Sequence, residues 1–396
     1  MTNWKNYWRL NPNITYLNHG SFGACPQPIL EKQQQLRTEM ESEPVQFFLH
    51  LESKLDEVRE TLAAFVGVNS SQLCFLPNAT TAVNTVLRSL SFSPDDELLI
   101  TNHGYNACNN AVKFVAERSQ AKVVVAEIPF PLTSPESAIS AILAKVSPRT
   151  RFALIDQITS PTALILPIAE IVRTLEEKGI EVFVDGAHSP GMLPLNLGAI
   201  GASYYTGNCH KWLCAPKGSA FLAVREDKQA QIRPLVISHG ANRQAVERSR
   251  FRLEFDWLGT VDPTPYLSIP SAIGFWSEIF PNGWEAASQR NHNLILEARN
   301  FLTQALGWRS PCPEEMMGSM ATLLLAEDEF TQVSAQELQG KLFETFKIEV
   351  PVIEWFSPPQ KMIRISAQLY NQLSDYQRLA DAWKKMRSNH QKLPLA

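Results

Sequence analysis

Lys211 is the residue of this sequence whose surroundings most suggest covalent chemistry. It lies in YYTGNCHKWLCAPKG (residues 204–218), among aromatic and apolar side chains. Apolar surroundings lower the pKa of a lysine amine, and the neutral amine can form a Schiff base with a carbonyl compound. The same composition also fits an exposed lysine beside a buried tryptophan, so this segment alone leaves both interpretations open.

Asp185 and His188 form a second candidate pair, in VFVDGAHSPG (residues 182–191). An apolar run leads directly into Asp185, which places its carboxylate at the end of a buried strand. Ligands of open α/β sheets bind beyond the carboxyl ends of the strands. A buried carboxylate there needs a positive partner or several hydrogen-bond donors. The alternative is an aspartate that only caps the turn between a strand and a helix.

The segment FLPNATTAV (residues 75–83) supplies a third candidate loop, between a strand and the start of a helix. Backbone N–H groups at a helix start, with neighbouring hydroxyls, suit a phosphate group. Taken alone, the segment fits an ordinary helix N-cap better. The residues concerned are Asn78, Ala79, Thr80 and Thr81.

Together the three segments match the needs of pyridoxal 5′-phosphate (PLP). Its phosphate suits a helix N-terminus, and its aldehyde suits a lysine amine such as Lys211. Its pyridine nitrogen suits a carboxylate such as Asp185, which keeps the ring protonated and strengthens it as an electron sink. We therefore predict PLP as the cofactor.

These loops need a sheet that brings the ends of separate strands to one edge. Between residues 72 and 187, short apolar runs alternate with amphipathic stretches. This alternation predicts an α/β fold, with a mostly parallel sheet covered by helices on both faces. Strands are expected at 72–76, 97–101, 121–128, 151–158 and 181–187, and a helical stretch at 27–66 with a break at Pro44. Two further strand-like runs, in 203–212 and 218–227, predict a hairpin or sheet-edge geometry.

A smaller α+β region is expected to follow the sheet. Residues 265–305 have a helical pattern, strand and helix signals alternate from about residue 310, and a last helix is expected at 374–389. We predict a large cofactor-binding domain at 18–268 and a small C-terminal domain at 269–396. Residues 1–17 are expected to pack with the small domain.

Composition excludes several classes of protein. The 396 residues carry 36 Lys and Arg against 40 Asp and Glu, without the basic excess typical of a sequence-independent nucleic-acid binder. No apolar run reaches the roughly 18–20 residues of a membrane helix, and the N-terminus lacks the apolar region of a secretory signal. Six cysteines without CxxC pairs indicate reduced thiols. We expect a cytoplasmic enzyme with no metal and no nucleic-acid or membrane partner.

DGAHSPG (185–191) and TGNCHKWLCAPKG (206–218) resemble the fold-type I PLP enzymes of the class V aminotransferase superfamily. YLNHGSFGACP (16–26), ITSPTALILPI (158–168) and WLGTVD (257–262) resemble its isopenicillin N epimerase-like members, whose relatives include carbon–sulfur lyases. The resemblance covers nearly the whole chain. It implies a PLP-dependent transferase fold, in which a mostly parallel seven-stranded sheet lies between helices and a smaller α+β domain follows.

The resemblance implies a role for each matching residue around the cofactor ring. Lys211 would bind the aldehyde, Asp185 would pair with the ring nitrogen, and His188 would hydrogen-bond the phenolic oxygen. Tyr105, in NHGYNAC, would stack on the ring. Ser160 falls where many relatives have a polar residue that contacts the cofactor.

Other matches concern the phosphate and the assembly. Asn78 and Ala79 belong to the phosphate loop, in which Thr80 and Thr81 would hold the phosphate together with His210. Thr260 matches a residue that reaches the phosphate of the neighbouring subunit. The resemblance therefore implies a homodimer with shared active sites.

Arg364, in KMIRIS, matches an arginine that binds the substrate α-carboxylate, a task that suits a bidentate guanidinium. Asn18 and His19 would line the substrate side. The resemblance favours epimerisation at the α-carbon of an amino-acid-type substrate, with a carbon–sulfur lyase or an aminotransferase as alternatives. Epimerisation needs a second acid, for which Tyr105 and His19 are candidates. Residues 342–363 contain no cysteine, which argues against persulfide chemistry.

Overall fold

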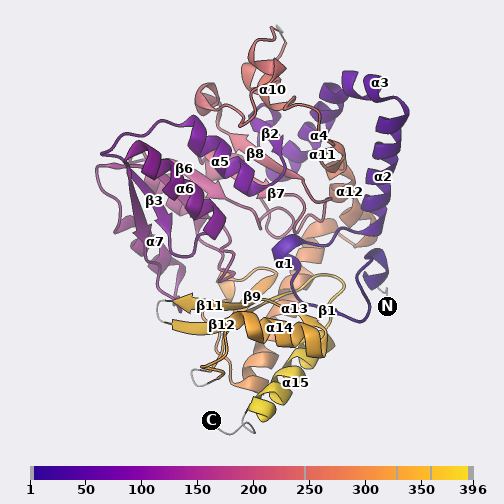
Figure 1. The fold of residues 1–396 in the computed structure, drawn as a ribbon, viewed down its shortest axis with the longest axis vertical. Coiled ribbons are helices and arrows are strands. Elements are labelled where there is room, and N and C mark those ends of the chain that lie inside the picture. The colour runs from indigo at the N-terminus through magenta and orange to yellow at the C-terminus, as the bar shows by residue number, and fades with distance from the viewer. Residues whose placement is uncertain (1–3, 245–246, 327–328, 357–358, 391–396) are drawn as a thin grey trace.

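The computed structural model describes residues 4–244, 247–326, 329–356 and 359–390. A seven-stranded sheet lies at the centre of the larger part of the molecule (Figure 1), with the strand order β2-β8-β7-β6-β5-β3-β4. Strand β8 pairs antiparallel with β2 and β7, and the other pairs are parallel. The predicted α/β fold with a mostly parallel, seven-stranded sheet is confirmed.

The strands form where the sequence has short, continuous apolar runs, because both faces of this sheet are covered. They are β2 (Leu73–Leu76), β3 (Glu97–Thr101), β4 (Lys122–Ala126), β5 (Thr150–Asp156), β6 (Glu181–Asp185), β7 (Tyr204–Asn208) and β8 (Ala220–Val224). The expected hairpin is present as the β7–β8 pair. The expected edge position is wrong, because β2 pairs with the outer side of β8 and takes the edge.

Amphipathic helices cover the two faces of the sheet. One apolar cluster joins a sheet face to α5 (Ala79–Ser89) and α6 (Asn106–Ser119). A second cluster joins the other face to α4, α7, α8 and α12. The helices of the larger part are α2 (Gln27–Ser42), α3 (Pro44–Leu49), α4 (Leu51–Val66), α7 (Pro135–Leu143), α8 (Ile168–Glu176), α9 (Leu197–Ile200), α10 (Arg250–Phe255), α11 (Thr264–Leu267) and α12 (Ile269–Ile279). Short 3-10 helices are η1 (Trp4–Tyr7), η2 (Ser70–Gln72), η3 (Glu226–Gln231), η4 (His239–Ala241) and η5 (Glu314–Met316).

The smaller part has its own apolar cluster around an antiparallel sheet. The sheet has the order β11-β12-β9, formed by β11 (Val352–Phe356), β12 (Pro359–Ser366) and β9 (Met320–Leu324). Its helices are α13 (Gly283–Leu306), α14 (Ala335–Phe346) and α15 (Leu373–His390). Strand β1 (Thr15–Tyr16) pairs in parallel with β10 (Ile348–Glu349), which ties the N-terminal segment to this part. Helix α12 packs on α2 and α4, and α13 packs on β9 and α15.

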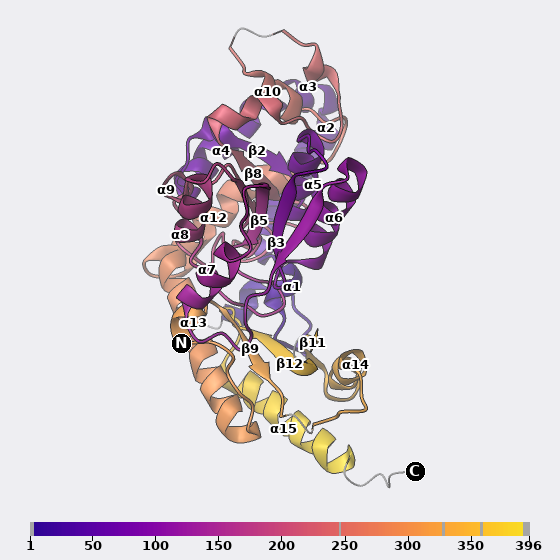
Figure 2. The ribbon, with the colours of Figure 1, turned by 90° about the vertical axis from the view of Figure 1, so that its left-hand side faces the viewer.

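The short helix α1 (His19–Phe22) lies at the junction of the two parts in both views (Figure 1, Figure 2). It is followed by Gly23, which has φ +70°. A Cβ at this position would lie 2.3 Å from the carbonyl oxygen of His210. Only glycine allows this close approach without strain, so the N-terminal segment lies directly against the segment that carries Lys211.

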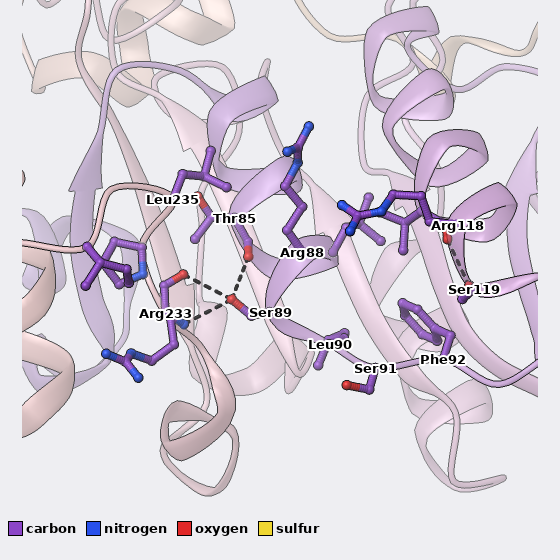
Figure 3. A pocket seen from close by; sticks show the side chains of 14 residues that line it. Thr85, Arg88, Ser89, Leu90, Ser91, Phe92, Arg118, Ser119, Arg233 and Leu235 are labelled. Carbon is purple, nitrogen blue, oxygen red and sulfur yellow. Dashed lines mark hydrogen bonds between the residues drawn. The ribbon is translucent and has the colours of Figure 1, made fainter. Parts of the chain in front are cut away.

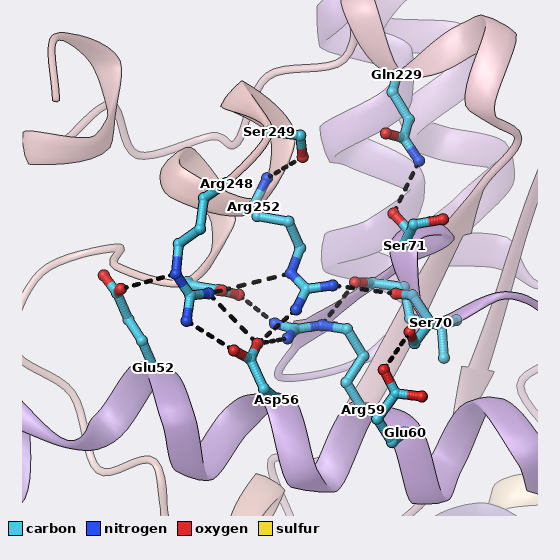
Figure 4. A network of polar contacts seen from close by, with 12 residues as sticks. Glu52, Asp56, Arg59, Glu60, Ser70, Ser71, Gln229, Arg248, Ser249 and Arg252 are labelled. Atoms are coloured by element: carbon cyan, nitrogen blue, oxygen red, sulfur yellow. Dashed lines mark hydrogen bonds and ion pairs between the residues drawn. The ribbon is translucent and has the colours of Figure 1, made fainter. Parts of the chain in front are cut away.

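Ion pairs hold α10 and the residues before it against α4 (Figure 4). The buried guanidinium of Arg59 contacts the carboxylates of Asp56 and Asp256. Arg248 and Arg252 also bind Asp56, with Arg248 Nη2 at 2.7 Å from Oδ2. These contacts anchor the chain just before the turn 257–262, which contains Thr260.

Candidate active site

A cleft of about 280 Å³ opens at the carboxyl edge of the large sheet. The last residues of three neighbouring strands line it: Asp156 of β5, Asp185 of β6 and Asn208 of β7. The first turn of α5 and the start of α6 complete the wall. The structure brings together here Lys211, Asp185, His188, Tyr105, Asn78, Ala79, Thr80, Ser160 and His210, as the sequence predicted.

Lys211 is partly buried on the side of the cleft formed by the segment after β7. Its Nζ lies 3.1 Å from Nε2 of His188. The indole Nε1–H of Trp212 donates to Nδ1 of the same imidazole at 3.3 Å. Burial lowers the pKa of Lys211 to about 8, outweighing the nearby carboxylate of Asp185. The amine is therefore available as a nucleophile and base close to neutral pH.

A second carboxyl group, that of Asp156, lies beside Asp185 at the edge of the sheet. Asp156 is its register neighbour on the adjacent parallel strand, so the two side chains project from the same edge of the sheet. Asp185 Oδ1 accepts from the backbone N–H of Ala187 at 3.0 Å, and Cys108 Sγ donates to Oδ2 at 3.2 Å. The backbone N–H of Tyr105 donates to Asp156 Oδ1 at 3.3 Å. Burial is the main cause that raises the pKa of each carboxyl group.

Asp156 was missed in the sequence, although a signal for it exists. The run RFALID ends in Asp156 in the same way that EVFVD ends in Asp185. The rule that selected Asp185, an acid at the end of an apolar strand, also selects Asp156. Among the other lining residues, Asn208, Ser21 and Phe22 were also missed.

The first turn of α5 has an N-cap and faces the cleft. Asn78 is the N-cap, and its Oδ1 accepts from the backbone N–H of Thr81 at 2.8 Å and from the Thr81 hydroxyl at 3.0 Å. Asn208 Oδ1 accepts from Ala79 N–H at 2.9 Å. Thr80 lines the cleft, whereas Thr81 lies outside its lining. The N-cap interpretation is confirmed, and the phosphate-binding interpretation stays a prediction for a helix start that faces the cleft.

Arg364 lies on β12 in the smaller part of the molecule, buried behind Ser21 and Ser160, which line the cleft; Arg364 and Asn18 are outside the lining themselves. Arg364 Nη1 donates to the backbone carbonyl and hydroxyl of Ser160, and its Nη2 donates to Ser21 Oγ at 2.9 Å and Asn18 Oδ1 at 3.4 Å. These partners are uncharged, and Nε has no hydrogen-bond partner. Burial lowers the pKa of Arg364 to about 10. A buried guanidinium with a free donor suits an anionic ligand such as a carboxylate.

The structure does not bring His19 to the cleft. The ring is fully buried; Nδ1 lies 2.7 Å from the Tyr370 hydroxyl, and Nε2 lies 3.1 Å from the carbonyl oxygen of Lys211. Burial lowers the pKa of His19 to about 3. His19 therefore lies outside the lining of this cleft and contacts the backbone of Lys211; its substrate-side role stays a prediction.

Thr260 also lies outside the cleft of its own chain. It is exposed in the turn 257–262, beside an apolar cavity of about 400 Å³ whose lining includes Gly259 and Val261. This position is compatible with a contact to another chain.

A larger cavity of about 720 Å³ lies at the C-terminal ends of α5 and α6 (Figure 3). Its lining includes Arg88, Arg118 and Ser89 and none of the residues singled out in the sequence. Arg88 and Arg118 lie in the last turns of the two helices, where a positive charge stabilises the helix dipole. Both guanidinium groups also lie over the ring of Phe114, at 4.9 and 5.7 Å from its centroid, so their positions are accounted for without a ligand, and the smaller cleft at the opposite helix ends is the candidate active site.

The profile of the family described as "Aminotransferase class-V" matches residues 15–304. The chain belongs to this family. Isopenicillin N epimerase of Streptomyces clavuligerus is 33% identical to this class V chain, over 94% of it and 95% of the relative. The "Probable L-cysteine desulfhydrase, chloroplastic" of Arabidopsis thaliana is 30% identical, over 94% of the chain and 82% of the relative.

Solved structures share the fold of the class V chain. The cysteine desulfurase CsdA of Escherichia coli has a TM-score of 0.80 at 18% identity, covering 97% of this chain and 98% of that one. The cystine C-S lyase C-DES has a TM-score of 0.78 at 20% identity, covering 93% and 97%. In the described residues, no helix combines the length and apolarity needed to cross a membrane. The cytoplasmic location stays a prediction.

The residues present fit the PLP of the family, as predicted. The N-terminus of α5 and Thr80 face the cleft, where the positive end of the helix dipole suits the phosphate, although the N–H groups of Ala79 and Thr81 already donate to Asn208 and Asn78. The carboxylates of Asp156 and Asp185 lie together at the ends of β5 and β6, where they suit a protonated ring nitrogen. Lys211 has a depressed pKa of about 8, which suits attack on an aldehyde. The protein is a PLP-dependent enzyme of class V.

Proposed function

We propose that this enzyme removes the α-proton of a small amino acid. One observation carries the proposal. The partly buried Lys211 amine lies in the same cleft as Ser21 and Ser160, and the hydroxyl groups of these serines accept hydrogen bonds from the Arg364 guanidinium. An amino acid needs both groups, a cation for its carboxylate and a base for its α-proton. The Nε–H of Arg364 is buried and has no hydrogen-bond partner, and Nη1 and Nη2 meet the cleft through Ser160 and Ser21, which a substrate carboxylate would replace as acceptors.

The residues of the chain have separate tasks in this reaction. When bound, PLP holds the substrate amine and takes up electron density from Cα. Arg364 orients the substrate through its carboxylate, and Lys211 Nζ accepts the proton from Cα. Asp185 would hold the ring nitrogen in its protonated form, and Tyr105 would pack against the ring. His188 would donate a hydrogen bond to the phenolic oxygen.

Two reactions begin with this proton transfer. The sequence resemblance placed epimerisation first, which requires a second proton donor on the opposite face of Cα. Of the two candidates for that donor, His19 lies outside the cleft, and Tyr105 lines the cleft but is 45% exposed and is also the residue proposed to pack on the ring. β-Elimination needs only the base Lys211. The geometry therefore favours a carbon–sulfur lyase, with epimerisation as the second candidate.

The size of the cleft supports a small substrate. Ligand pockets span roughly 300–1,000 Å³, and this cleft of about 280 Å³ must hold PLP as well as the reacting part of the substrate. For cysteine, β-elimination consumes one water and yields hydrogen sulfide, pyruvate and ammonia. No cysteine is among the described lining residues of the cleft. We therefore expect the sulfur to leave as free sulfide, without passing through a protein thiol.

Product analysis separates the candidate reactions. The holoenzyme is incubated with L-cysteine, D-cysteine and a panel of unsubstituted amino acids, and sulfide, pyruvate and enantiomeric composition are measured together. We expect equal amounts of sulfide and pyruvate from cysteine. Interconversion of enantiomers without sulfide would assign epimerisation instead. Keto-acid formation limited to one equivalent per subunit would assign a half-transamination, and no change in any amino acid would overturn the proposal.

The assembly we propose is a homodimer in the cytoplasm. Leu235, Val236, Ile237 and Val261 are exposed apolar residues, and three of them line the apolar cavity beside Thr260. Contiguous exposed apolar surface marks interaction sites. A second copy of the chain would cover this surface and bring Thr260 to the cleft of its partner.

A further inference from the structure

The buried indole of Trp212 is linked to the Lys211 amine through the imidazole of His188. Trp212 is 1% exposed and follows Lys211 directly in the chain. The Nε1–H donates to Nδ1 of His188 at 3.3 Å, and Nε2 of His188 lies 3.1 Å from Nζ of Lys211. A continuous set of contacts therefore runs from the indole through the imidazole to the amine.

The chemistry of these groups determines where the protons lie. An indole N–H is only a donor, so Nδ1 of His188 must accept. Burial holds the pKa of His188 well below its ordinary value, and the ring is neutral near pH 7. A neutral imidazole that accepts at Nδ1 carries its proton on Nε2. Above the Lys211 pKa of about 8 the amine is neutral, and Nε2–H then donates to its Nζ.

We propose that Trp212 is a positioning residue that fixes the proton of His188 on Nε2. His188 thereby presents a donor to the Lys211 amine and, when PLP is bound, to the phenolic oxygen. Without the indole N–H, the proton could move to Nδ1. The Nε2 lone pair would then accept from a protonated Lys211 and stabilise its charge. The inference rests on the roles proposed for Lys211 and His188, and it is independent of the reaction that follows proton removal.

Charged and titratable groups from several elements face Lys211 and His188. The carboxylates raise the pKa of Lys211, whereas Arg364 lowers the pKa of both Lys211 and His188. Burial is the largest effect on each. The groups are Asp156 on β5, Asp185 on β6, Cys108 on α6, Arg364 on β12, His19 on α1 and His210 beside Lys211. Trp212→Phe leaves all of these residues in the sequence, removes the indole N–H and keeps an aromatic ring beside His19, whose ring centroid lies 4.8 Å from that of Trp212.

Nitrogen NMR of ¹⁵N-histidine-labelled, cofactor-free protein observes the proton directly. His188→Gln identifies the His188 signals by their loss. We expect the Nε2–H tautomer in the wild type and an increased Nδ1–H population in Trp212→Phe. Trp308→Phe is the matched control, because Trp308 is also 1% exposed and donates its Nε1–H at 3.3 Å, to Glu329. It should leave the His188 signals unchanged.

The rate of PLP uptake by cofactor-free protein gives a second readout that needs no turnover. The rate should rise with pH as Lys211 loses its proton, with a midpoint near 8 in the wild type. Trp212→Phe should move this midpoint upward by about one pH unit, and Trp308→Phe should not. In a His188→Gln background Trp212→Phe should have no effect, because an amide N–H donates in either case.

Two results would overturn the inference. One is an Nδ1–H tautomer of His188 in the wild type, which decides the matter even where Trp212→Phe does not fold. The other is a folded Trp212→Phe whose tautomer and midpoint equal those of the wild type. A failure of the proposed lyase reaction would alter neither readout, so the two proposals fail separately.

Discussion

Replacing Arg364 by glutamine tests how the substrate is held. In the structure Nε is free, while Nη1 and Nη2 bond uncharged groups of Ser160 and Ser21. Two hydrogen bonds to a carboxylate are worth about 1.5–3 kcal/mol each, or roughly 100- to 10,000-fold in kcat/KM at 1.4 kcal/mol per factor of ten. We expect the lower half of that range, because Ser160 and Ser21 already satisfy part of the guanidinium.

The same substitution should leave the substrate-free fold nearly as stable. The pKa of Arg364 falls from 12.5 to about 10 on burial, which corresponds to roughly 3 kcal/mol against holding the charge there. Arg364→Gln removes this cost but also loses its hydrogen bonds to Ser160, Ser21 and Asn18, at about 1 kcal/mol each. The two effects offset each other, so we expect the free energy of unfolding to change by less than about 1 kcal/mol.

The assay compares kcat/KM for L-cysteine and its methyl ester, which keeps Cα but lacks the negative charge. In the wild type the acid should be preferred strongly. In Arg364→Gln the ratio of the two values should approach one, while the absorption band of bound PLP is retained. A variant that still prefers the acid as strongly as the wild type would refute the assignment of Arg364 to the carboxylate.

Three further predictions concern the cofactor, the fold and the assembly. Asp185→Ala should lower kcat by roughly 100- to 1,000-fold, which is about 3–4 kcal/mol of transition-state stabilisation, because a preorganised charge is lost. Near-normal turnover would mean that another group holds the ring nitrogen. Arg59→Met should lower the free energy of unfolding by about 3 kcal/mol in urea, because it leaves buried carboxylates without their partner, whereas Arg37→Met, which breaks an exposed pair, should cost less than about 1 kcal/mol; equal losses would show that the buried network does not anchor α10. Mixed Lys211→Ala and Thr260→Ala chains should regain activity, because one site of each heterodimer then has both residues intact; no activity above that of the separate variants would argue against shared sites.

Local patterns predicted most of the elements. The strand expected at 97–101 is β3 (Glu97–Thr101), and the helical stretch expected at 27–66 with a break at Pro44 is α2 (Gln27–Ser42), α3 (Pro44–Leu49) and α4 (Leu51–Val66). Apolar runs and helical periodicity are sufficient to predict these elements, because buried side chains recur about every 3.6 residues in a helix and form short continuous runs in a strand that is covered on both faces. The position of β8 between β2 and β7 was not predicted, since strand order depends on contacts between distant segments.

The candidate site was predictable where a residue follows a strand or starts a helix. Asp185 and Asn78 are such residues, and Asp156 could have been selected by the same rule. The placement of His19 was not predictable, because its burial depends on Tyr370, 351 positions away. The contact of Trp212 with His188 joins two loops in the same way, and no periodic pattern encodes it.

The central claim is that Lys211 removes the α-proton of a small amino acid held at PLP. Proton NMR of L-cysteine and L-alanine in heavy water, with the holoenzyme, tests this claim most directly. We predict loss of the alanine α-proton signal by exchange with solvent deuterium, and pyruvate formation from cysteine. Both should be absent in Lys211→Ala that retains bound PLP. Exchange at the wild-type rate in Lys211→Ala, or no exchange and no elimination in the wild type, would contradict the account.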